Sequence, residues 1–301
     1  MTPRDTDTGP TPASPTHAAT PTTSNPAPDA TRHLNPDTAG VPATDPVSGA
    51  PSLTRAWPSH LRAMPSPLET ARFGRTVERL TVTADSPARL DDVREAILAS
   101  TAEVLVLRYP AEHVTWYAGL TGLGRTALFA DALVYWHLVA GRGRPPEPSP
   151  DLGTRPISGA VEVEDLVDAI FSGYANHYAA NPLFTAAQAT AGYREWALRS
   201  AEEGHCLALH DPDTQALLGL ATLDEDGPAT EILLAGVVPS AQGRGLYGHL
   251  LKGVEDRALA RGATRVLIST QAHNVRVQRA WTRYGFEPVR TVLTLHLLRQ
   301  A

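Results

Sequence analysis

The segment GVVPSAQGRGLYGHLL, residues 236–251, constrains the fold of this chain most. An apolar run ends at Pro239, two glycines flank Arg244, and helical spacing begins at once. A strand that passes directly into a helix leaves the first helical N–H groups unpaired, and the helix dipole favours an anion there. Gly243 and Gly245 let the backbone approach a phosphate without a Cβ atom. The segment predicts a pyrophosphate cradle, and a purely structural glycine cap is the alternative.

The segments around these glycines predict an open sheet covered by helices. Helical spacing is present near VEVEDL and through AAQATAGYREWALRSA, with NPLF between the two helices. Strand character follows in HCLALH, ALLGLATL and EILLAGVV, which are joined by hairpin-turn compositions. After the helix that begins at the glycines, we expect a strand in TRVLIST, a helix in NVRVQRAWTRY and a closing strand in EPVRTVLTLHLL. The fold class is therefore α/β of the α+β kind, with a mixed, mainly antiparallel sheet.

Composition divides the chain into four parts. Residues 1–73 are rich in Pro, Thr and Ala and have few large apolar side chains to offset the entropy of ordering, so we expect a disordered leader. A misplaced start codon is the alternative, because Met64 is the first methionine after Met1. The other parts are a small α/β domain over residues 74–141, a proline-rich linker over 142–156 and the main domain over 157–301.

Two segments in different parts of the chain have a similar pattern. Residues 103–138 and 264–298 each contain an apolar strand, a helix, a glycine and a long closing strand, in the same order. The glycines are Gly124 and Gly285. This pattern indicates that the small domain is a degenerate repeat of the main one, and two unrelated β-α-β units are the alternative.

Charge and composition argue against several classes of protein. The formal net charge of −6 gives no broad basic field, which argues against nucleic acid as a partner. No apolar run reaches the ~20 residues of a membrane span, and MTPRDTDTGP lacks the apolar core of a secretory signal. Cys206 is the only cysteine, and His205 and His249 have no partners at metal-ligand spacing, so we expect no disulfide and no metal. We expect a cytoplasmic protein.

Two landmarks resemble the GCN5-related N-acetyltransferases, abbreviated GNAT. The acetyl-CoA loop of that family reads Gln or Arg, two residues, Gly, one residue, then Gly or Ala, and it is similar to Gln242, Gly245 and Tyr247 here. Residues 273–286 resemble the second landmark, an Asn that opens a helix ending in Gly-Phe. The resemblance covers about residues 157–298. A preceding half-domain joined by a linker resembles the branch that includes TDP-fucosamine acetyltransferase.

The resemblance implies an N-acetyltransferase that transfers the acetyl group of acetyl-CoA directly to a small amine. A nucleotide-linked amino sugar is the leading acceptor, and a homodimer is left open. Asn274 is also expected to cap its helix. The resemblance implies cofactor contacts from Val237, Val238, Gln242, Gly243, Arg244, Gly245, Leu246, Tyr247 and Asn274.

The catalytic residues are harder to assign. Glu231 lies eleven residues before Gln242, where the histone-acetyltransferase branch places its catalytic glutamate, so it is the candidate general base. A solvated surface glutamate is the alternative. The family often has a Tyr four residues before the Gly of the Gly-Phe pair, but this chain has Trp281 there, and an indole is no practical acid. Tyr284 is the nearby candidate for that role.

The cluster YANHYAANP supplies the candidate acceptor residues. Tyr174, His177 and Tyr178 are expected on one face of the first helix, since residues three and four apart are neighbours there. Asn181 follows at the helix exit, in the region that lines the acceptor pocket of the family. An aromatic stripe that belongs to the core is the alternative.

Two other functions remain open from sequence. The acceptor amine could belong to a natural product or a peptide instead of a sugar. The chain could also be a non-catalytic acyl-CoA-binding or regulatory module, because Trp281 removes the usual acid while the phosphate loop is kept.

Overall fold

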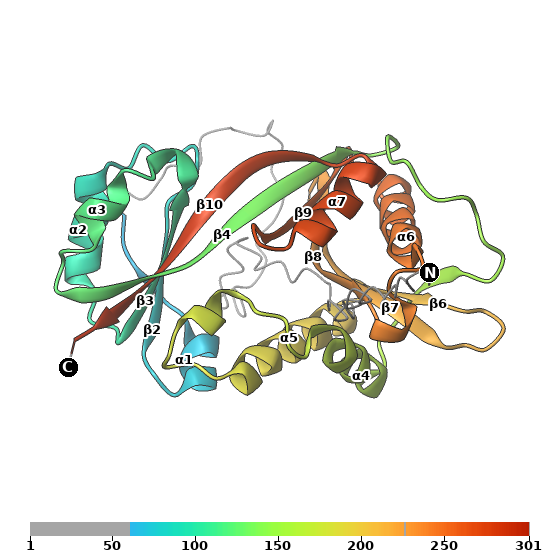
Figure 1. The fold of residues 1–301 in the computed structure, drawn as a ribbon, viewed down its shortest axis with the longest axis horizontal. Coiled ribbons are helices and arrows are strands. Elements are labelled where there is room, and N and C mark those ends of the chain that lie inside the picture. The colour runs from blue at the N-terminus through green and yellow to red at the C-terminus, as the bar shows by residue number, and fades with distance from the viewer. Residues whose placement is uncertain (1–60, 226, 301) are drawn as a thin grey trace, which may run out of the picture.

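The computed structural model describes residues 61–225 and 227–300 of this chain (Figure 1). The N-terminal half contains β1 (Met64–Pro65), α1 (Pro67–Phe73), β2 (Val77–Thr81), α2 (Leu90–Ala99), β3 (Val104–Pro110), the 3-10 helix η1 (Ala111–His113), α3 (Trp116–Leu120) and β4 (Arg125–Val139).

The C-terminal half continues through a second set of helices and strands. In order these are β5 (Gly153–Pro156), α4 (Ala160–Phe171), η2 (His177–Ala180), α5 (Ala186–Glu202), β6 (Cys206–His210), β7 (Leu217–Asp224), β8 (Ala229–Val237), η3 (Pro239–Ala241), α6 (Leu246–Ala260), β9 (Arg265–Gln271), α7 (Val275–Tyr284) and β10 (Glu287–Arg299).

The strands of both halves join in a 10-stranded sheet, in the order β1-β2-β3-β10-β4-β9-β8-β7-β6-β5. β2 runs parallel to β3 and β8 runs parallel to β9, while the other neighbouring strands are antiparallel. The predicted mixed, mainly antiparallel sheet is confirmed. β5 pairs with β6 at one edge, so residues 153–156 of the predicted linker belong to the sheet.

The two halves exchange their closing strands. β10, from the C-terminal half, pairs with β3 along residues 292–298 and with β4 on its other side. β4, from the N-terminal half, pairs with β9 along residues 133–139. Figure 1 shows β4 and β10 as two long neighbouring strands that cross from one half of the molecule to the other. Each half is therefore completed by a strand that the other half supplies.

The repeat predicted from the sequence pattern has a counterpart in this topology. β3, α3 and β4 of the first unit correspond in order to β9, α7 and β10 of the second. Gly124 and Gly285, which precede the closing strands, have φ angles of 69° and 117°. Only glycine adopts such angles at no steric cost. In both units a glycine with a positive φ therefore precedes the closing strand.

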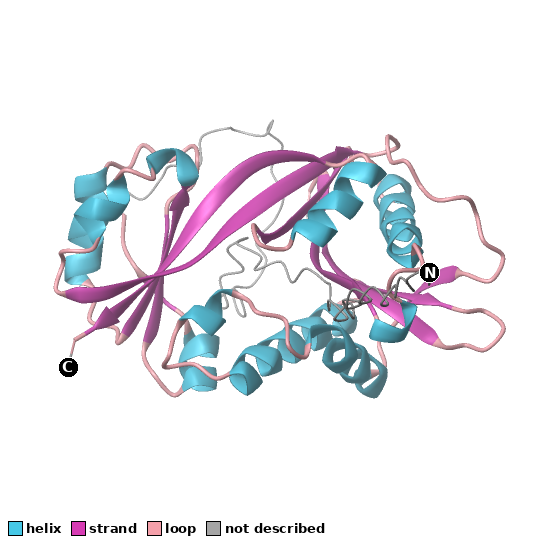
Figure 2. Cartoon of the chain, viewed as in Figure 1, coloured by secondary structure: helices cyan, strands magenta, loops and turns pink. Residues whose placement is uncertain are grey.

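Helices cover both faces of the sheet (Figure 2). Helices α6 and α7 pack on one face of the C-terminal half, where Val254 and Trp281 meet Ile268. Helices α4 and α5 cover the other face, and α1 and η2 continue this layer over the N-terminal half. We call this second side the η2 face. Helices α2 and α3 cover the opposite side of β2 and β3.

The predicted disordered leader is wrong for its last ten residues. β1 and α1 lie within residues 64–73, and Gly74 ends α1 with a φ of 63°. Phe73 is buried, and its ring centroid lies 3.8 Å from that of Phe184 and 4.9 Å from that of Tyr178. Tertiary packing that the local composition does not reveal therefore orders this segment. Residues 1–60 lie outside the described chain.

Candidate active site

β8 and β9 run parallel and part toward their carboxyl ends. Ladder pairing joins residues 229–232 to residues 265–268, and within the described chain it continues no further. The parting coincides with a bulge, because the register of β8 with β7 shifts across Leu233. A bulge bends its strand and disrupts the ladder locally. β8 continues to Val237, so its residues 233–237 border the gap. These residues have no ladder pairing with β9.

The turn between β8 and α6 has the predicted strand, turn and helix geometry. Gly243 has a φ of 76°, and Gly245, with a φ of 80°, is the N-cap residue of α6. A Cβ atom at either glycine would meet no atom within 4 Å, so the space over this turn is open. Arg244 is exposed between them. The start of a helix beside an open glycine turn can accept an anion such as a diphosphate.

Hydrogen bonds tie this turn to the end of β8. The side-chain amide of Gln242 donates from Nε2 to the carbonyl oxygen of Val237 across 3.3 Å. The N–H of Val238 donates to the carbonyl oxygen of Leu218 on β7 across 2.9 Å. The predicted cofactor residues at the end of β8 and in the turn therefore form one continuous structure beside the gap.

The side chain of Tyr247 does not join the exposed face of the turn. It packs against the core under α6, and its hydroxyl oxygen accepts a hydrogen bond from Nε1 of Trp281 across 3.1 Å. Burial raises the pKa of the Tyr247 phenol, and the indole bond lowers it by less. This orientation leaves only the backbone of Tyr247 for the predicted cofactor contact.

A polar cluster closes the other side of the gap at the end of β9. Asn274 donates from Nδ2 to the hydroxyl of Thr270 across 3.2 Å and to the hydroxyl of Tyr174 across 3.5 Å. Tyr174 in turn donates to the side-chain oxygen of Gln271. The predicted capping role of Asn274 is wrong: it stands at the N-cap position of α7, but its side chain makes no cap hydrogen bond and bonds to this cluster instead.

Tyr174, His177 and Tyr178 do not share one helix face, so that prediction is wrong in its geometry. α4 already ends at Phe171, before Tyr174, and Gly173 turns the chain with a φ of 99°. The remaining residues of the cluster belong to η2 and its C-terminal end, and Asn176 caps η2. Helical spacing therefore does not apply between Tyr174 and η2. The side-chain hydrogen bonds of these residues fall into three groups.

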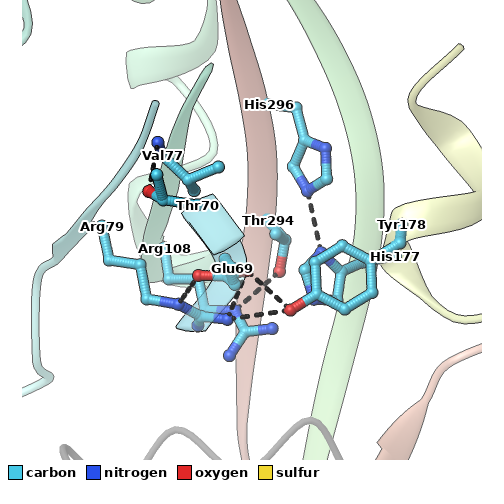
Figure 3. Close-up of polar contacts among 9 residues, drawn as sticks. All are labelled: Glu69, Thr70, Val77, Arg79, Arg108, His177, Tyr178, Thr294 and His296. Atoms are coloured by element: carbon cyan, nitrogen blue, oxygen red, sulfur yellow. Dashed lines mark hydrogen bonds and ion pairs between the residues drawn. The ribbon is translucent and has the colours of Figure 1, made fainter. Parts of the chain in front are cut away.

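His177 and Asn181 both bond to His296 of β10, and Figure 3 shows the contact between the two histidines. Asn181 accepts the N–H of Leu183 at Oδ1, which orients its Nδ2 as the donor to Nδ1 of His296 across 3.1 Å. His296 must then carry its proton on Nε2 and donate it to Nδ1 of His177 across 2.8 Å. Burial, followed by the nearby His177, lowers the pKa of His296 well below its usual value. The Asn181 amide therefore fixes the tautomer of His296 and makes it the donor to His177.

Tyr178 belongs to a buried ion-pair group in the N-terminal half (Figure 3). Its hydroxyl donates to Oε1 of Glu69 across 2.6 Å and accepts from Nη2 of Arg79 across 3.2 Å. Arg79 pairs with both oxygens of Glu69 at 2.6 and 2.9 Å. Burial by itself raises the pKa of Glu69, but Arg79 outweighs it, and the pKa falls to about 2. This group joins α1, β2 and η2.

Comparisons with known proteins agree with this geometry. Residues 167–286 match the family model described as the acetyltransferase (GNAT) family. This segment is therefore similar to the acetyltransferases of that family. The matched segment contains the β8–β9 gap, the glycine turn and the cluster at the end of β9.

One curated relative has detectable sequence identity in part of its chain. A mycothiol acetyltransferase of Beutenbergia cavernae is 39% identical over 82 residues, which are 27% of this chain and 28% of that protein. The alignment thus spans little more than a quarter of that relative's length. It supports the GNAT family and does not extend to whole-protein activity.

Solved structures show a similar fold that extends beyond the segment matched by the family model. A Drosophila protein has a TM-score of 0.54 at 17% identity, covering 76% of this chain and 75% of that one. A GCN5-related glucosamine N-acetyltransferase region of a fungal multi-domain GH3 β-N-acetylglucosaminidase has a TM-score of 0.50 at 11% identity, covering 74% of this chain and 30% of that one. Three quarters of the chain is more than residues 157–301, so the shared fold includes part of the N-terminal half.

Glu231 lies inside the segment that matches the family model, just before the gap. It is buried on β8, opposite Asp224 of β7 and beside Leu267 of β9. Its side chain is only 7% exposed, so the alternative of a solvated surface glutamate is wrong. Opposed residues of an antiparallel pair have neighbouring side chains, so Glu231 and Asp224 form a carboxylate pair two residues from the bulge.

Tyr284, the other predicted catalytic residue, lies at the far end of α7. Ten residues of helix separate the cluster around Asn274 from it, which corresponds to ~15 Å along the axis. Its hydroxyl donates to Oε2 of Glu255 across 2.7 Å, and Glu255 accepts the N–H groups of Gly141 and Gly143. These contacts join α6, α7 and the segment after β4, and Tyr284 is not part of the mechanism proposed below.

The sequence analysis missed several residues around the site. Thr270 and Gln271 end β9 in a run that reads as ordinary strand, and Glu69 and Arg79 lie in or beside the predicted leader. Asp131 is also buried, on β4. The sequence marks Asp131 only as a charged residue inside an apolar strand. Such a residue is a candidate functional residue, because a buried aspartate is rare unless it is paired.

Among the described residues, no group of three or more His, Cys, Asp or Glu side chains could hold a metal ion. No helix in the same part of the chain is long and apolar enough to cross a membrane. Cys206 is buried in the core between the sheet and helices α4 and α5, and burial raises the pKa of its thiol to about 12.

Proposed function

We propose that this chain is an acetyl-CoA-dependent N-acetyltransferase that acts on a small amine. The observation that carries the proposal is the parting of β8 and β9 beside an open glycine turn at the start of α6. The turn fits the diphosphate of coenzyme A, because Gly243 and Gly245 leave room where any other residue would place a Cβ atom. The end of β8 then offers backbone groups to the pantetheine arm.

The reaction needs a proton acceptor and a place for the amine. The amine nitrogen loses a proton and attacks the thioester carbonyl, the C–S bond breaks, and the thiolate takes up a proton. Glu231 is the proposed base, since it is a buried carboxylate two residues before the bulge where the strands part. A proton passes from the amine to Glu231 directly or through one water. Tyr174 and Gln271 are placed to position the acceptor at the end of β9.

Two experiments test this proposal in sequence. Calorimetry with acetyl-CoA tests the cradle, and release of free thiol in the presence of a panel of primary amines tests transfer. We expect acetyl-CoA to bind, and Glu231→Gln to lower turnover at neutral pH with partial recovery as the pH rises. Binding without thiol release from any amine would favour the non-catalytic acyl-CoA module. Absence of binding would overturn the proposal.

Two acceptor classes follow from different features. The two-half architecture resembles the branch that acts on a nucleotide-linked amino sugar, which makes that sugar one candidate. The buried carboxylate of Asp131 on the η2 face favours the other, a cationic amine of a natural product or peptide. A nucleotide would bring additional negative charge to this face, whereas a second amine would bring positive charge.

A further inference from the structure

Asp131 is a buried carboxylate that makes no hydrogen bond in the described chain. Its side chain is 6% exposed, and neither Oδ1 nor Oδ2 has a hydrogen-bond partner among the described residues. A buried carboxylate is normally paired or hydrogen-bonded, because removal of an isolated charge from water is very costly. An unmet carboxylate therefore indicates a ligand that brings the missing cation.

The side chain of Asp131 lies on the η2 face. Asp131 is directly opposite Thr294 of β10, and opposed residues of an antiparallel pair share a face. Thr294 is in turn opposite Arg108 of β3, and its hydroxyl accepts from Nε of Arg108 across 3.3 Å. Val104 and Val106 lie on the same face of β3 as Arg108, because residues two apart on a strand share a face. Both valines pack in the same layer as α1 and η2. The carboxylate thus lies in the layer that also contains His177 and His296.

The charged groups around Asp131 do not neutralise it by contact. Arg108 lies two strands away, a Cα separation of about 10 Å, and no ion pair within 4 Å joins it to Asp131 in the described chain. Arg79 is engaged with Glu69. His296, two residues from Thr294, is held neutral by burial. The described residues also offer no group of ligands for a metal ion, so an organic cation is the suitable partner.

The position of Asp131 relative to the gap determines which cation it can bind. The ladder between β8 and β9 ends at Ile268, three residues before Gln271, and Gln271 is opposite Leu133 on β4. Asp131 lies two residues further, so about five residues of strand, or roughly 16 Å, separate it from the parting point. This distance is too long for contact with the amine that attacks the thioester. The carboxylate can instead reach a second positive group on the same molecule.

We propose that Asp131 binds a second cationic group of the acceptor, remote from the amine that is acetylated, and that the chain selects elongated acceptors with two amines. This rests on the N-acetyltransferase function proposed above. The N-terminal half then takes part in specificity, because β4 carries Asp131 from that half to the side of β9. The proposal also explains why β4, the closing strand of the N-terminal half, contains the buried carboxylate of Asp131.

A series of linear diamines, each compared with the monoamine of the same chain length, tests the proposal by thiol release. For the longer diamines we expect a KM at least about tenfold below that of the monoamine, as for a buried charge pair. Asp131→Asn should remove this difference and leave the KM for acetyl-CoA unchanged. Asp165→Asn, an exposed aspartate of α4, is the control and should retain the preference.

A second measurement does not depend on turnover. Without ligand, Asp131→Asn should raise the melting temperature, because it removes a buried charge that only the ligand compensates. A lower melting temperature would make Asp131 a structural residue and overturn the proposal. Equal KM values for diamines and monoamines in the native chain would overturn it as well, and the N-acetyltransferase function would stand. Loss of acetyl-CoA binding itself would instead contradict the proposed function.

Discussion

The indole N–H of Trp281 donates a hydrogen bond to the hydroxyl oxygen of Tyr247 across 3.1 Å. Trp281 is fully buried on α7, and Tyr247 lies in the first turn of α6, directly after the glycine turn. The bond therefore connects the helix that begins at the proposed diphosphate site with the helix that begins at the end of β9. It also keeps the phenol ring of Tyr247 away from the open side of the turn.

Replacing Tyr247 by Phe should destabilise the protein by about 1–3 kcal/mol, because the buried indole N–H of Trp281 loses its partner. Urea denaturation measures the change. Tyr117→Phe on α3 is the matched control, since Tyr117 is 37% exposed, and it should change the free energy of unfolding by less than about 0.5 kcal/mol. Equal effects from the two variants would show that the bond contributes nothing measurable.

Gly245→Asp should weaken acetyl-CoA binding by about a hundredfold or more, because it places a carboxylate where the helix start would face a diphosphate. Gly245→Asn is the control, since Asn has a similar size and tolerates a positive φ equally well but has no charge. Calorimetry compares the two, and circular dichroism checks that both remain folded. If Asn weakens binding as much as Asp, backbone shape and not charge explains the effect.

Glu69→Gln should cost roughly 2–3 kcal/mol of stability, near the lower limit for a buried ion pair because the side chain of Arg79 is 28% exposed. The control is Glu103→Gln, whose pair with Arg75 is exposed to solvent and should contribute much less to stability. The pKa of Glu69 is lowered from 4.5 to about 2, so its contribution is complete above pH 4.5 and is lost as the pH falls toward 2. Urea denaturation at neutral pH and in acid should therefore show the Gln variant and the native chain converge as the pH falls. A constant difference across that range would argue against the ion pair as the cause.

His296 should make the protein less stable in mild acid. Its pKa is lowered in the folded chain, so the unfolded chain takes up a proton first, and stability falls as the pH drops below the ordinary value of 6.5. The free energy of unfolding should decrease by up to about 1.4 kcal/mol per pH unit from this one group. His296→Asn should flatten that slope, whereas His137→Gln, at the partly exposed histidine of β4, should not. An unchanged slope in the Asn variant would show that His296 is not responsible for the pH dependence of the unfolding free energy.

The sequence predicted those parts of the fold whose causes are local. The passage from β8 through the glycine turn into α6 was predictable from the sequence. Pro239 restricts its own φ angle, and Gly243 and Gly245 permit the positive φ angles of the turn. The predicted repeat rests on Gly124 and Gly285, each of which has a positive φ and precedes a long closing strand. The order of the strands was not predictable, since alternation identifies β4 and β10 as strands but does not select their neighbours.

The candidate site was less predictable, because long-range contacts decide where its side chains point. Tyr174 reads as one member of a helical stripe with η2, but the turn at Gly173 directs it to Gln271 instead. Asn274 reads as a helix cap, yet Thr270 and Tyr174 compete successfully for its amide. Nothing in the local sequence shows that these partners lie nearby.

The exchange of β4 and β10 has a practical consequence. A protease that nicked the proline-rich connection after Val139 would not release two separate pieces, because β10 would remain bonded between β3 and β4 and β4 would remain bonded to β9. To come apart, the fragments would have to strip both long strands out of the middle of the sheet. The nicked protein should therefore elute from a sizing column at the position of the intact chain.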